Sequence, residues 1–242
     1  MRQLVISVVI IISFASCGQQ PTIDYDEKLD TTSVVDDRLK DTTKILVSEL
    51  PIRFDSTDIL IFAIGLVDLQ ERGGYDKIGS GSYSSSEDSS SYFSQDYLSG
   101  NFINLVFQDK EGKERKLTDK KVVIRNANFL RGIFKKTKSG YLLYSVNDRD
   151  SNGDKELSHS DLEALYISRI DGTDFKKISK ELHEFYDYNL IKGEKRLYFR
   201  TLEDKNKDGE LNNKDQFHYY YIDFSAHGYV VTEYDPVKIF EQ

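Results

Sequence analysis

A 54-residue repeat constrains the fold of this chain more than any other feature of its sequence. Two acidic stretches begin at Asp150 and Asp204, and the same offset relates Tyr144 to Tyr198. Each copy reads as a turn, a strand, an acidic loop, a second strand, another turn and a third strand. The repeat therefore predicts duplicated β units, each with its own acidic loop.

Short apolar runs rich in β-branched and aromatic residues flank the acidic loops, and turns containing glycine separate them. Helical periodicity is weak. Residues 180–186 fit a short helix or a plain connection, and residues 161–170 are the one place where a helix could follow a loop. The sequence predicts a mainly β fold of repeated antiparallel hairpin or blade-like units. The expected strands are residues 59–64, 102–107, 121–124, 141–146, 164–167, 196–200, 219–222 and 229–231.

A degenerate first unit fits the same plan upstream. Residues 59–65 would form the strand before the loop and residues 102–108 the strand after it, with a turn at 110–113. The connection 66–101 takes the place of the acidic loop and contains a Ser-rich stretch, residues 79–94. Because that stretch is polar and of low complexity, we expect it to be disordered or a mobile surface loop.

The downstream loop, residues 204–215, has the spacing of a twelve-residue calcium loop. Ca²⁺ takes about six to eight oxygen ligands, which such loops supply from positions 1, 3, 5, 7, 9 and 12. Gly209 holds position 6, where the chain turns sharply, and Leu211 holds position 8, where an apolar side chain ties the loop to the body. The candidate ligands are Asp204, Asn206, Asp208, the carbonyl of Glu210, Asn212 and Asp215.

The upstream loop admits two frames of the same pattern. A start at Asp148 puts Gly153 at position 6 but a histidine at position 12, whereas a start at Asp150 puts Asp161 at position 12 but Lys155 at position 6. We use the second frame because it superposes on the downstream loop, and Lys155 makes this the weaker site. The candidate ligands are Asp150, Asn152, Asp154, Glu156 and Asp161. The alternative is a pair of acidic turns that bind no ion.

The aspartate at position 12 makes the downstream loop resemble those of dockerin modules more than those of calmodulin-like sensors, which carry Glu there. The flanking residues 196–200 and 217–222 are strand-like, so we expect no true EF-hand helix pair. Hairpins that end in Asp-Gly turns, with acidic loops between strands, resemble blades of β-propellers of the TolB-like and related periplasmic types. Three units are fewer than a closed propeller has. The resemblance therefore implies a partial or open propeller-like stack, and a β-sandwich built from a duplicated unit is the alternative.

The first 16 residues read as a secretory signal, in which a short basic start precedes the apolar run 4–12. That run is too short to span a bilayer. The residues Phe14-Ala15-Ser16-Cys17 resemble the lipobox of bacterial lipoproteins. The resemblance implies cleavage before Cys17, the only cysteine of the chain, and attachment of a lipid to it.

These features predict three regions: a signal peptide at 1–16, a lipidated cysteine with a flexible acidic tether at 17–44, and a β-repeat domain at 45–242. We expect the protein in the bacterial cell envelope, held by its lipid on the periplasmic face or the cell surface. The formal net charge of -8 argues against nucleic acid and against an anionic membrane surface as electrostatic partners. Contact with the membrane is therefore expected through the lipid.

No familiar catalytic constellation is present. The four histidines, His159, His183, His218 and His227, have no zinc spacing, and the chain has no nucleophile elbow, phosphate loop or dinucleotide fingerprint. Two function classes remain. One is a calcium-binding interaction module whose strand face or loop end contacts another envelope protein or a glycan. The other is an envelope hydrolase or carbohydrate-active protein with structural calcium. We favour the interaction module.

Overall fold

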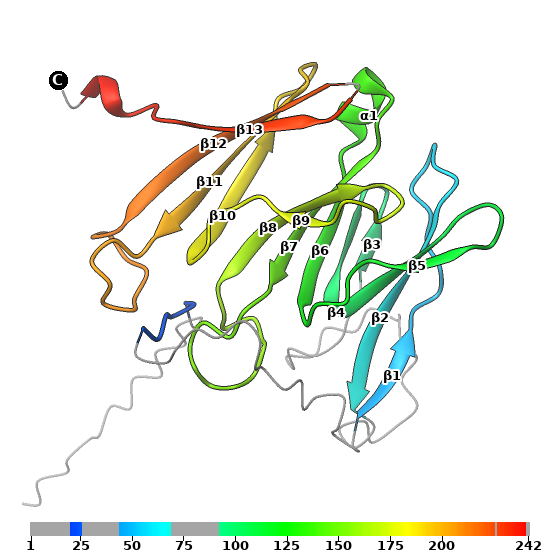
Figure 1. Ribbon diagram of the computed structural model, residues 1–242, viewed down its shortest axis with the longest axis horizontal. Coiled ribbons are helices and arrows are strands. Elements are labelled where there is room, and N and C mark those ends of the chain that lie inside the picture. The colour runs from blue at the N-terminus through cyan, green and yellow to red at the C-terminus, as the bar shows by residue number, and fades with distance from the viewer. Residues whose placement is uncertain (1–19, 26–43, 69–91, 226, 241–242) are drawn as a thin grey trace, which may run out of the picture.

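The computed structural model describes residues 20–25, 44–68, 92–225 and 227–240. In these ranges the chain is mainly β, with antiparallel strands and a single α-helix. Figure 1 shows three successive groups of strands along the long axis, from β1 and β2 at one end to β10–β13 at the other. The mainly β class with antiparallel units, predicted from the sequence, is confirmed.

Each group is a four-stranded antiparallel meander. The first contains β1 (Lys44–Ser48), β2 (Leu60–Asp68), β4 (Tyr97–Gln108) and β5 (Glu114–Lys116), with β3 (Tyr92–Ser94) paired to β4. The second contains β6 (Val123–Phe129), β7 (Tyr141–Asn147), β8 (Glu163–Arg169) and β9 (Lys176–Lys177). The third contains β10 (His183–Leu190), β11 (Arg196–Glu203), β12 (Gln216–Phe224) and β13 (Tyr229–Tyr234). The helix α1 (Arg131–Thr137) connects β6 to β7, and the 3-10 helix η2 (Lys238–Phe240) follows β13.

The long strand β4 joins the first two meanders into one nine-stranded sheet. Its C-terminal half pairs with β2, and its N-terminal half pairs with β6. The register shifts in both pairings, between Ile64 and Gly65 and between Ser99 and Phe102, interrupt the regular ladder, and interruptions of the β-bulge kind bend a strand and increase its twist. The third meander is a separate sheet with the strand order β10-β11-β12-β13.

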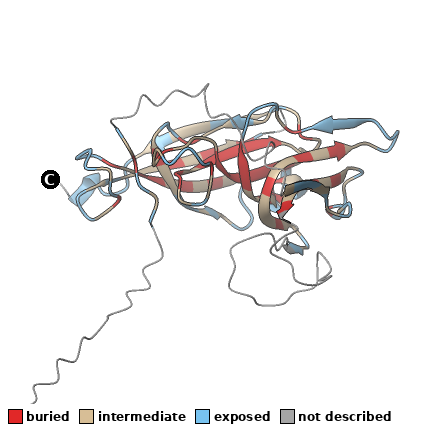
Figure 2. Cartoon of the chain, turned by 90° about the horizontal axis from the view of Figure 1, so that it is seen from below, coloured by how far each residue is buried: buried red, intermediate tan, exposed pale blue. Residues whose placement is uncertain are grey.

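The second meander packs on both of its faces, and its strand β7 is buried at every residue. Successive side chains of a strand point to opposite faces. Tyr144 and Val146 therefore enter a core cluster shared with the first meander, whereas Tyr141 and Leu143 enter a cluster shared with the third. Figure 2 shows the buried residues along the middle of the strands. The apolar run at 141–146, which only Ser145 interrupts, reflects this burial on two sides.

Two segments for which the sequence left a helix open are strands. β8 covers residues 163–169, and β10 begins at His183. β8 pairs with β7 along its whole length and buries Leu165 and Ile167, and these tertiary contacts override the weak helical spacing. The sequence does not predict α1, whose seven residues are too few for a periodic signal. Burial of Ile133 and a left-handed C-cap at Lys138 hold that helix in place.

The other expected strands are present with shifted ends. β6, for example, begins at Val123 and runs on to Phe129. Of the Ser-rich stretch 79–94, only residues 92–94 lie within the described ranges, and they form β3. The 54-residue offset maps β7 onto β11 and β8 onto β12. Each acidic loop therefore joins the second and third strands of its meander.

Leu197→Ala should lower the free energy of unfolding by about 2–5 kcal/mol, the usual cost of truncating a large buried aliphatic side chain. Leu197 is 0% exposed in the core cluster between the second and third meanders. The same substitution at Leu46, which is 60% exposed in β1, should change it by no more than about 0.5 kcal/mol. Urea unfolding followed by circular dichroism measures both effects, and equal losses would contradict this core assignment.

Candidate functional site

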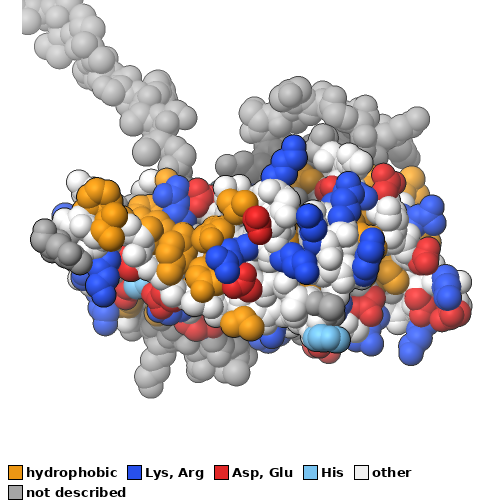
Figure 3. All heavy atoms as spheres, turned by 90° about the horizontal axis from the view of Figure 1, so that it is seen from above, with side chains coloured by type: hydrophobic (Ala, Val, Ile, Leu, Met, Phe, Trp, Pro, Cys, Tyr) orange, Lys and Arg blue, Asp and Glu red, His pale blue; other side chains and the backbone are white. Residues whose placement is uncertain are grey.

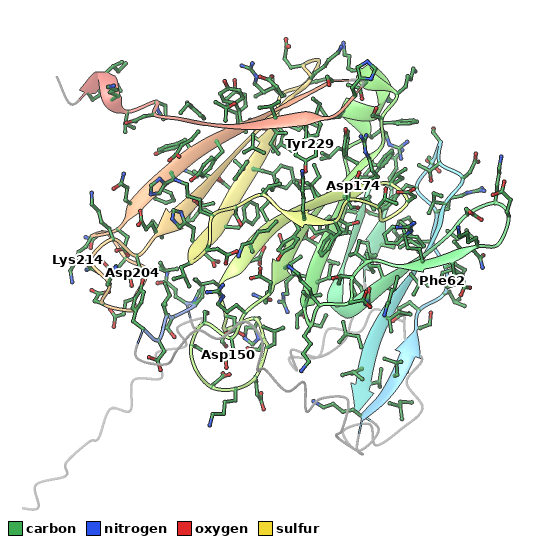
Figure 4. All side chains as sticks on the ribbon, viewed as in Figure 1. Phe62, Asp150, Asp174, Asp204, Lys214 and Tyr229 are labelled. Atoms are coloured by element: carbon green, nitrogen blue, oxygen red, sulfur yellow. The ribbon has the colours of Figure 1, made fainter. Side chains whose placement is uncertain are left out.

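The two acidic loops lie at the same end of neighbouring meanders. The first joins β7 to β8, and the second joins β11 to β12. Figure 4 places Asp150 and Asp204, the first residue of each loop, on the same edge of the molecule. The segment 20–25 lies between the two loops in Figure 1. Stacking of the meanders therefore gathers three chain segments that are distant in sequence.

The second loop is closed by hydrogen bonds from its backbone to its own carboxylates. The Gly209 N–H donates to Oδ2 of Asp204 at 2.8 Å. Asp215, at position 12, accepts from the backbone N–H of Asn212 at 2.7 Å and of Lys205 at 3.2 Å. The carboxylates at positions 1 and 12 thereby fix the loop in a tight turn.

The first loop makes the same hydrogen bonds at the same positions when it is counted from Asp150. The Lys155 N–H, at position 6, donates to Oδ2 of Asp150 at 2.8 Å. Asp161, at position 12, accepts from the backbone N–H of Ser158 at 2.8 Å and of Ser151 at 2.7 Å. The hydrogen bonds of the first loop thus match those of the second loop when the first is counted from Asp150. They do not match when it is counted from Asp148.

The side chains at positions 3 and 5 also contact each other in both loops. Asn206 Nδ2 lies 2.8 Å from Asp208 Oδ2, and Asn152 Nδ2 lies 3.0 Å from Asp154 Oδ2. The structure therefore groups the candidate side chains at positions 3 and 5 in the same way in each loop.

The glutamates at position 7, Glu156 and Glu210, have exposed side chains, so only their backbone carbonyls are candidate ligands. Position 6 is left-handed in both loops, with φ of 84° at Gly209 and 68° at Lys155. That conformation is costly for a residue with a Cβ. The backbone of the first loop is therefore strained at Lys155, whereas Gly209 adopts the same left-handed conformation in the second loop without strain.

One carboxylate oxygen in the second loop is buried and accepts no backbone hydrogen bond within the described part of the chain. Asp204 is 3% exposed; its Oδ2 accepts from the Gly209 N–H, its Oδ1 accepts from no backbone N–H of the described residues, and the Tyr25 hydroxyl lies beside the carboxylate. Burial of an unpaired carboxylate oxygen is costly unless a cation or a donor meets it. Position 1 is where a twelve-residue loop supplies its first ligand. The donor set of this loop thus fits a divalent cation that prefers oxygen.

Two pKa shifts reflect the same concentration of buried acidity. Burial raises the pKa of the Asp161 carboxyl, which is 1% exposed, and the nearby Asp150 charge adds to the effect. Partial burial, and then the Asp204 charge, raise the pKa of Tyr25 to about 12. Tyr25 therefore stays a neutral phenol beside the Asp204 carboxylate.

Residues 20–25, which we call the N-terminal strap, lie across both loops. The Ile23 N–H donates to the Gly209 carbonyl at 2.9 Å, and the Asp24 N–H donates to the Ser151 carbonyl at 2.7 Å. In return, Ser151 Oγ donates to the Thr22 carbonyl at 3.2 Å. Two adjacent residues of the strap thereby connect the second loop to the first.

Ile23 fixes the strap to the body. It is 5% exposed and packs with Leu162, Leu202 and Leu211, so the position-8 leucine of the second loop is buried, as a residue tying the loop to the body should be. The predicted flexible tether at 17–44 therefore does not hold for residues 20–25. One isoleucine, two backbone–backbone hydrogen bonds and one hydrogen bond from the Ser151 side chain dock a segment whose composition alone indicates a solvated chain. Residues 26–43 lie outside the described part.

A second group of potential ligands lies on the third meander, and spacing in the sequence does not reveal it. His183 begins β10, Glu203 ends β11, and His218 lies in β12. One ligand atom from each lies within 4.8 Å of the others. The cross-strand pairs His183 with Glu203 and Thr201 with His218 put these side chains on one face of the sheet. Only the strand register, which the sequence does not specify, brings them together.

The electrostatics of this group are asymmetric. Burial, followed by the charge of His218, lowers the pKa of His183 to about 4, so His183 is neutral. His218 lies between two carboxylates, with Nε2 at 2.7 Å from Glu203 and Nδ1 at 3.0 Å from Glu233. These hydrogen bonds lower the pKa of both carboxyl groups. The cluster therefore holds two ionised carboxylates around one imidazole.

The membrane features of the sequence fall largely outside the described residues. Cys17 and the signal segment are not among them. Within the described ranges, no helix has the length and apolar character needed to cross a membrane.

Gly209→Ala should cost more stability than Gly112→Ala. Both glycines have positive φ, 84° and 81°, so both substitutions strain the backbone. Only at Gly209 would the new Cβ lie 2.6 Å from the Ile23 carbonyl oxygen, whereas at Gly112 it meets nothing within 4 Å.

We expect a difference of about 1 kcal/mol or more in the free energy of unfolding, with faster hydrogen exchange at the Ile23 amide in Gly209→Ala alone. Urea unfolding and amide exchange measure the two effects. Equal costs together with an equally protected Ile23 amide would contradict the docking of the strap.

Comparison with known proteins identifies no family. No family model matches the chain, and no curated protein matches it. Among solved structures, it is similar to a protein described as a TolB of Agrobacterium tumefaciens, with 10% identity and a TM-score of 0.23. The match covers 77% of this chain and 80% of that one. A likeness this weak adds nothing to the fold that the strands themselves show.

Proposed function

We propose that this chain is a lipid-anchored, calcium-binding interaction module of the bacterial envelope. The observation that carries the calcium proposal is the buried Oδ1 of Asp204, which accepts no backbone hydrogen bond from the described residues and lies at the position where a twelve-residue loop supplies its first ligand. The repeated hydrogen bonds of the first loop extend the proposal to a second, weaker ion site.

Each ion would be held by one loop. In the second loop the holders are the side chains of Asp204, Asn206, Asp208 and Asp215 and the carbonyl of Glu210. In the first loop they are the side chains of Asp150, Asn152, Asp154 and Asp161 and the carbonyl of Glu156. A bound calcium ion supplies positive charge and a rigid oxygen shell, so the loops keep their shape without mutual repulsion of their carboxylates.

The N-terminal strap links the two calcium loops to the proposed lipid anchor at Cys17. Cys17 lies six residues before Ile23, and extended chain covers at most about 20 Å over that length. A lipid on Cys17 would therefore hold the loop end of the body close to the membrane surface. Calcium at the loops would fix the surface against which the strap docks, and with it the orientation of the body.

The outer face of the third meander offers the surface for a partner. Arg196 is bound by Asp223 through two hydrogen bonds of 2.7 and 2.8 Å, and its guanidinium lies 4.4 Å from the centre of the Tyr221 ring. Arg200 is bound by Asp187 in the same way and lies over the ring of Tyr186.

Three tyrosines complete this face, because the Tyr198 ring lies 5.8 Å from that of Tyr221 and 5.7 Å from that of Tyr234. In Figure 3, hydrophobic side chains mixed with charged ones gather on the half of the molecule that holds the third meander. Tyrosine and arginine predominate among the residues that carry binding energy at protein interfaces. This composition favours another envelope protein over a glycan as the partner.

Calcium should raise the melting temperature of the chain. Binding stabilises the folded state by about 2.7 kcal/mol at a hundredfold excess over the dissociation constant. Asp204→Asn should remove most of the gain at the second loop, and Asp150→Asn should remove less, because Lys155 already weakens the first. Magnesium should substitute poorly, since it demands a tighter octahedral shell.

The matched control is Asp109→Asn, in an acidic hairpin turn where Asp109 accepts hydrogen bonds from the backbone of Glu111 and Lys113. This variant should keep the full gain. Thermal melting in chelator and in millimolar calcium, with titration calorimetry, measures the effect. Equal melting temperatures and no calcium uptake by the wild type would reject the calcium proposal.

Cys17→Ala should release the protein from the membrane fraction, because the lipid acceptor is lost. Ser16→Ala, one residue earlier, should remain anchored, since it retains the acceptor and a small residue before it. Metabolic labelling with a radioactive fatty acid, followed by fractionation, compares the variants. A wild-type protein without label would overturn the lipid anchor and leave the calcium proposal untouched.

A further inference from the structure

We propose that His183, His218 and Glu203 form a binding site for a first-row transition-metal ion of the zinc type. The three residues come from β10, β12 and β11, and their nearest ligand atoms lie within 4.8 Å of one another. Bonds of about 2.0–2.2 Å to zinc place tetrahedral ligand atoms about 3.3 Å apart. Closing the group around an ion therefore needs only small side-chain rotations.

Each imidazole already has the hydrogen bond that orients a metal ligand. Nδ1 of His218 lies 3.0 Å from Oε1 of Glu233, and Nδ1 of His183 lies 3.0 Å from Oγ1 of Thr201. Glu233 is in turn held by Lys180 at 2.9 Å. Metal-bound histidines commonly engage one ring nitrogen in such a bond and turn the other toward the ion. The arrangement leaves Nε2 of both rings for the metal.

Each ring nitrogen of His218 contacts a carboxylate, and these two contacts have the geometry of a ligand and of its supporting hydrogen bond. A neutral imidazole has one N–H, yet Nε2 lies 2.7 Å from Oε2 of Glu203 while Nδ1 meets Glu233. Both contacts are hydrogen bonds only when the ring carries two N–H groups or when a cation lies beside Nε2. A metal ion between Nε2 and Glu203 satisfies both atoms, and Nδ1–H then donates to Glu233.

The ligand types separate this site from the acidic loops. Calcium and magnesium take oxygen ligands, whereas imidazole suits zinc, copper, nickel and iron. Two histidines and one glutamate leave a fourth tetrahedral position for water. On the same face, Tyr220 pairs with Glu233 across the strands, and its hydroxyl lies beside Lys180 and Thr201.

The ligand set does not come from the repeat. At the corresponding positions 54 residues earlier, Glu203 and His218 are replaced by Arg149 and Ala164, which offer no ligand. The three residues therefore occur together only in the third meander, so the shared scaffold does not explain them. The Glu203 side chain is 41% exposed, which gives an ion access from solvent.

Titration of the full chain with Zn²⁺ in saturating Ca²⁺ tests the site. We expect one zinc ion per chain in addition to any held by the acidic loops. His183→Gln, His218→Gln and Glu203→Gln should each weaken that binding more than a hundredfold. Glu233→Gln should weaken it about 10–100-fold, as expected for the partner of a metal ligand. His227→Gln, which changes a histidine outside the group, should bind as the wild type does.

Co²⁺ gives an independent readout, because a tetrahedral site with two imidazoles produces a strong visible absorption band. The wild type and His227→Gln should show this band, and His218→Gln should lose it. Circular dichroism identifies any variant that fails to fold. If a histidine variant does not fold, Glu203→Gln tests the site instead, because Glu203 is partly exposed. Absence of zinc uptake by the wild type, or unchanged uptake in folded His218→Gln or Glu203→Gln, would overturn the proposal.

Discussion

Burial of β7 on both faces is the constraint on which the rest of the structure depends. A sheet of a few strands needs its apolar face covered to be stable, and the two outer meanders obtain that cover from opposite sides of the second. Tyr144 lies in the core cluster shared with the first meander, and Leu143 lies in the cluster shared with the third. Adjacent residues of one strand therefore pack against both outer meanders. A chain without this two-sided strand would have two separate sheets, each with an exposed apolar face.

The position of the acidic loops follows from this stacking. Equivalent strands of neighbouring meanders end at the same level, so loops that are 54 residues apart in sequence lie side by side. Stacked sheets lie about 10 Å apart, and successive residues of extended chain advance about 3.3–3.6 Å. That proximity is why Ile23 and Asp24, which are adjacent, can donate to different loops. The same proximity brings many carboxylates together, and their repulsion favours any cation that the loops can hold.

Much of this arrangement is readable from local sequence. The run 141–146, apolar at every position except Ser145, indicates a strand buried on both faces, and the shared spacing of the loops indicates which residues are equivalent. What local sequence does not contain is the identity of long-range partners. Ile23 docks on a loop almost 190 residues later, and its own neighbours are polar and acidic. The helix α1 is defined by burial of Ile133 rather than by a periodic pattern.

The group of His183, Glu203 and His218 shows most clearly that local sequence does not identify long-range partners. His183 and His218 lie 35 residues apart in sequence, on strands separated by a third, and they meet because β11 pairs with both in a fixed register. A slip of one residue in either pairing would turn one of these side chains to the opposite face of the sheet. Spacing rules describe ligands on one helix or one loop, so they do not find ligands assembled by register.

The end of β11 connects the two proposed metal chemistries. Glu203 faces the histidines, and Asp204, the next residue, turns into the acidic loop with its buried carboxylate. A cation held by either residue would restrict the same short piece of backbone. The second ion would then bind to a site whose backbone is already ordered, so its binding would cost less conformational entropy. This is positive coupling between the two sites without a change of fold. Because the strap is bonded to Gly209 in that loop, ordering at the end of β11 reaches the segment that leads to the proposed anchor.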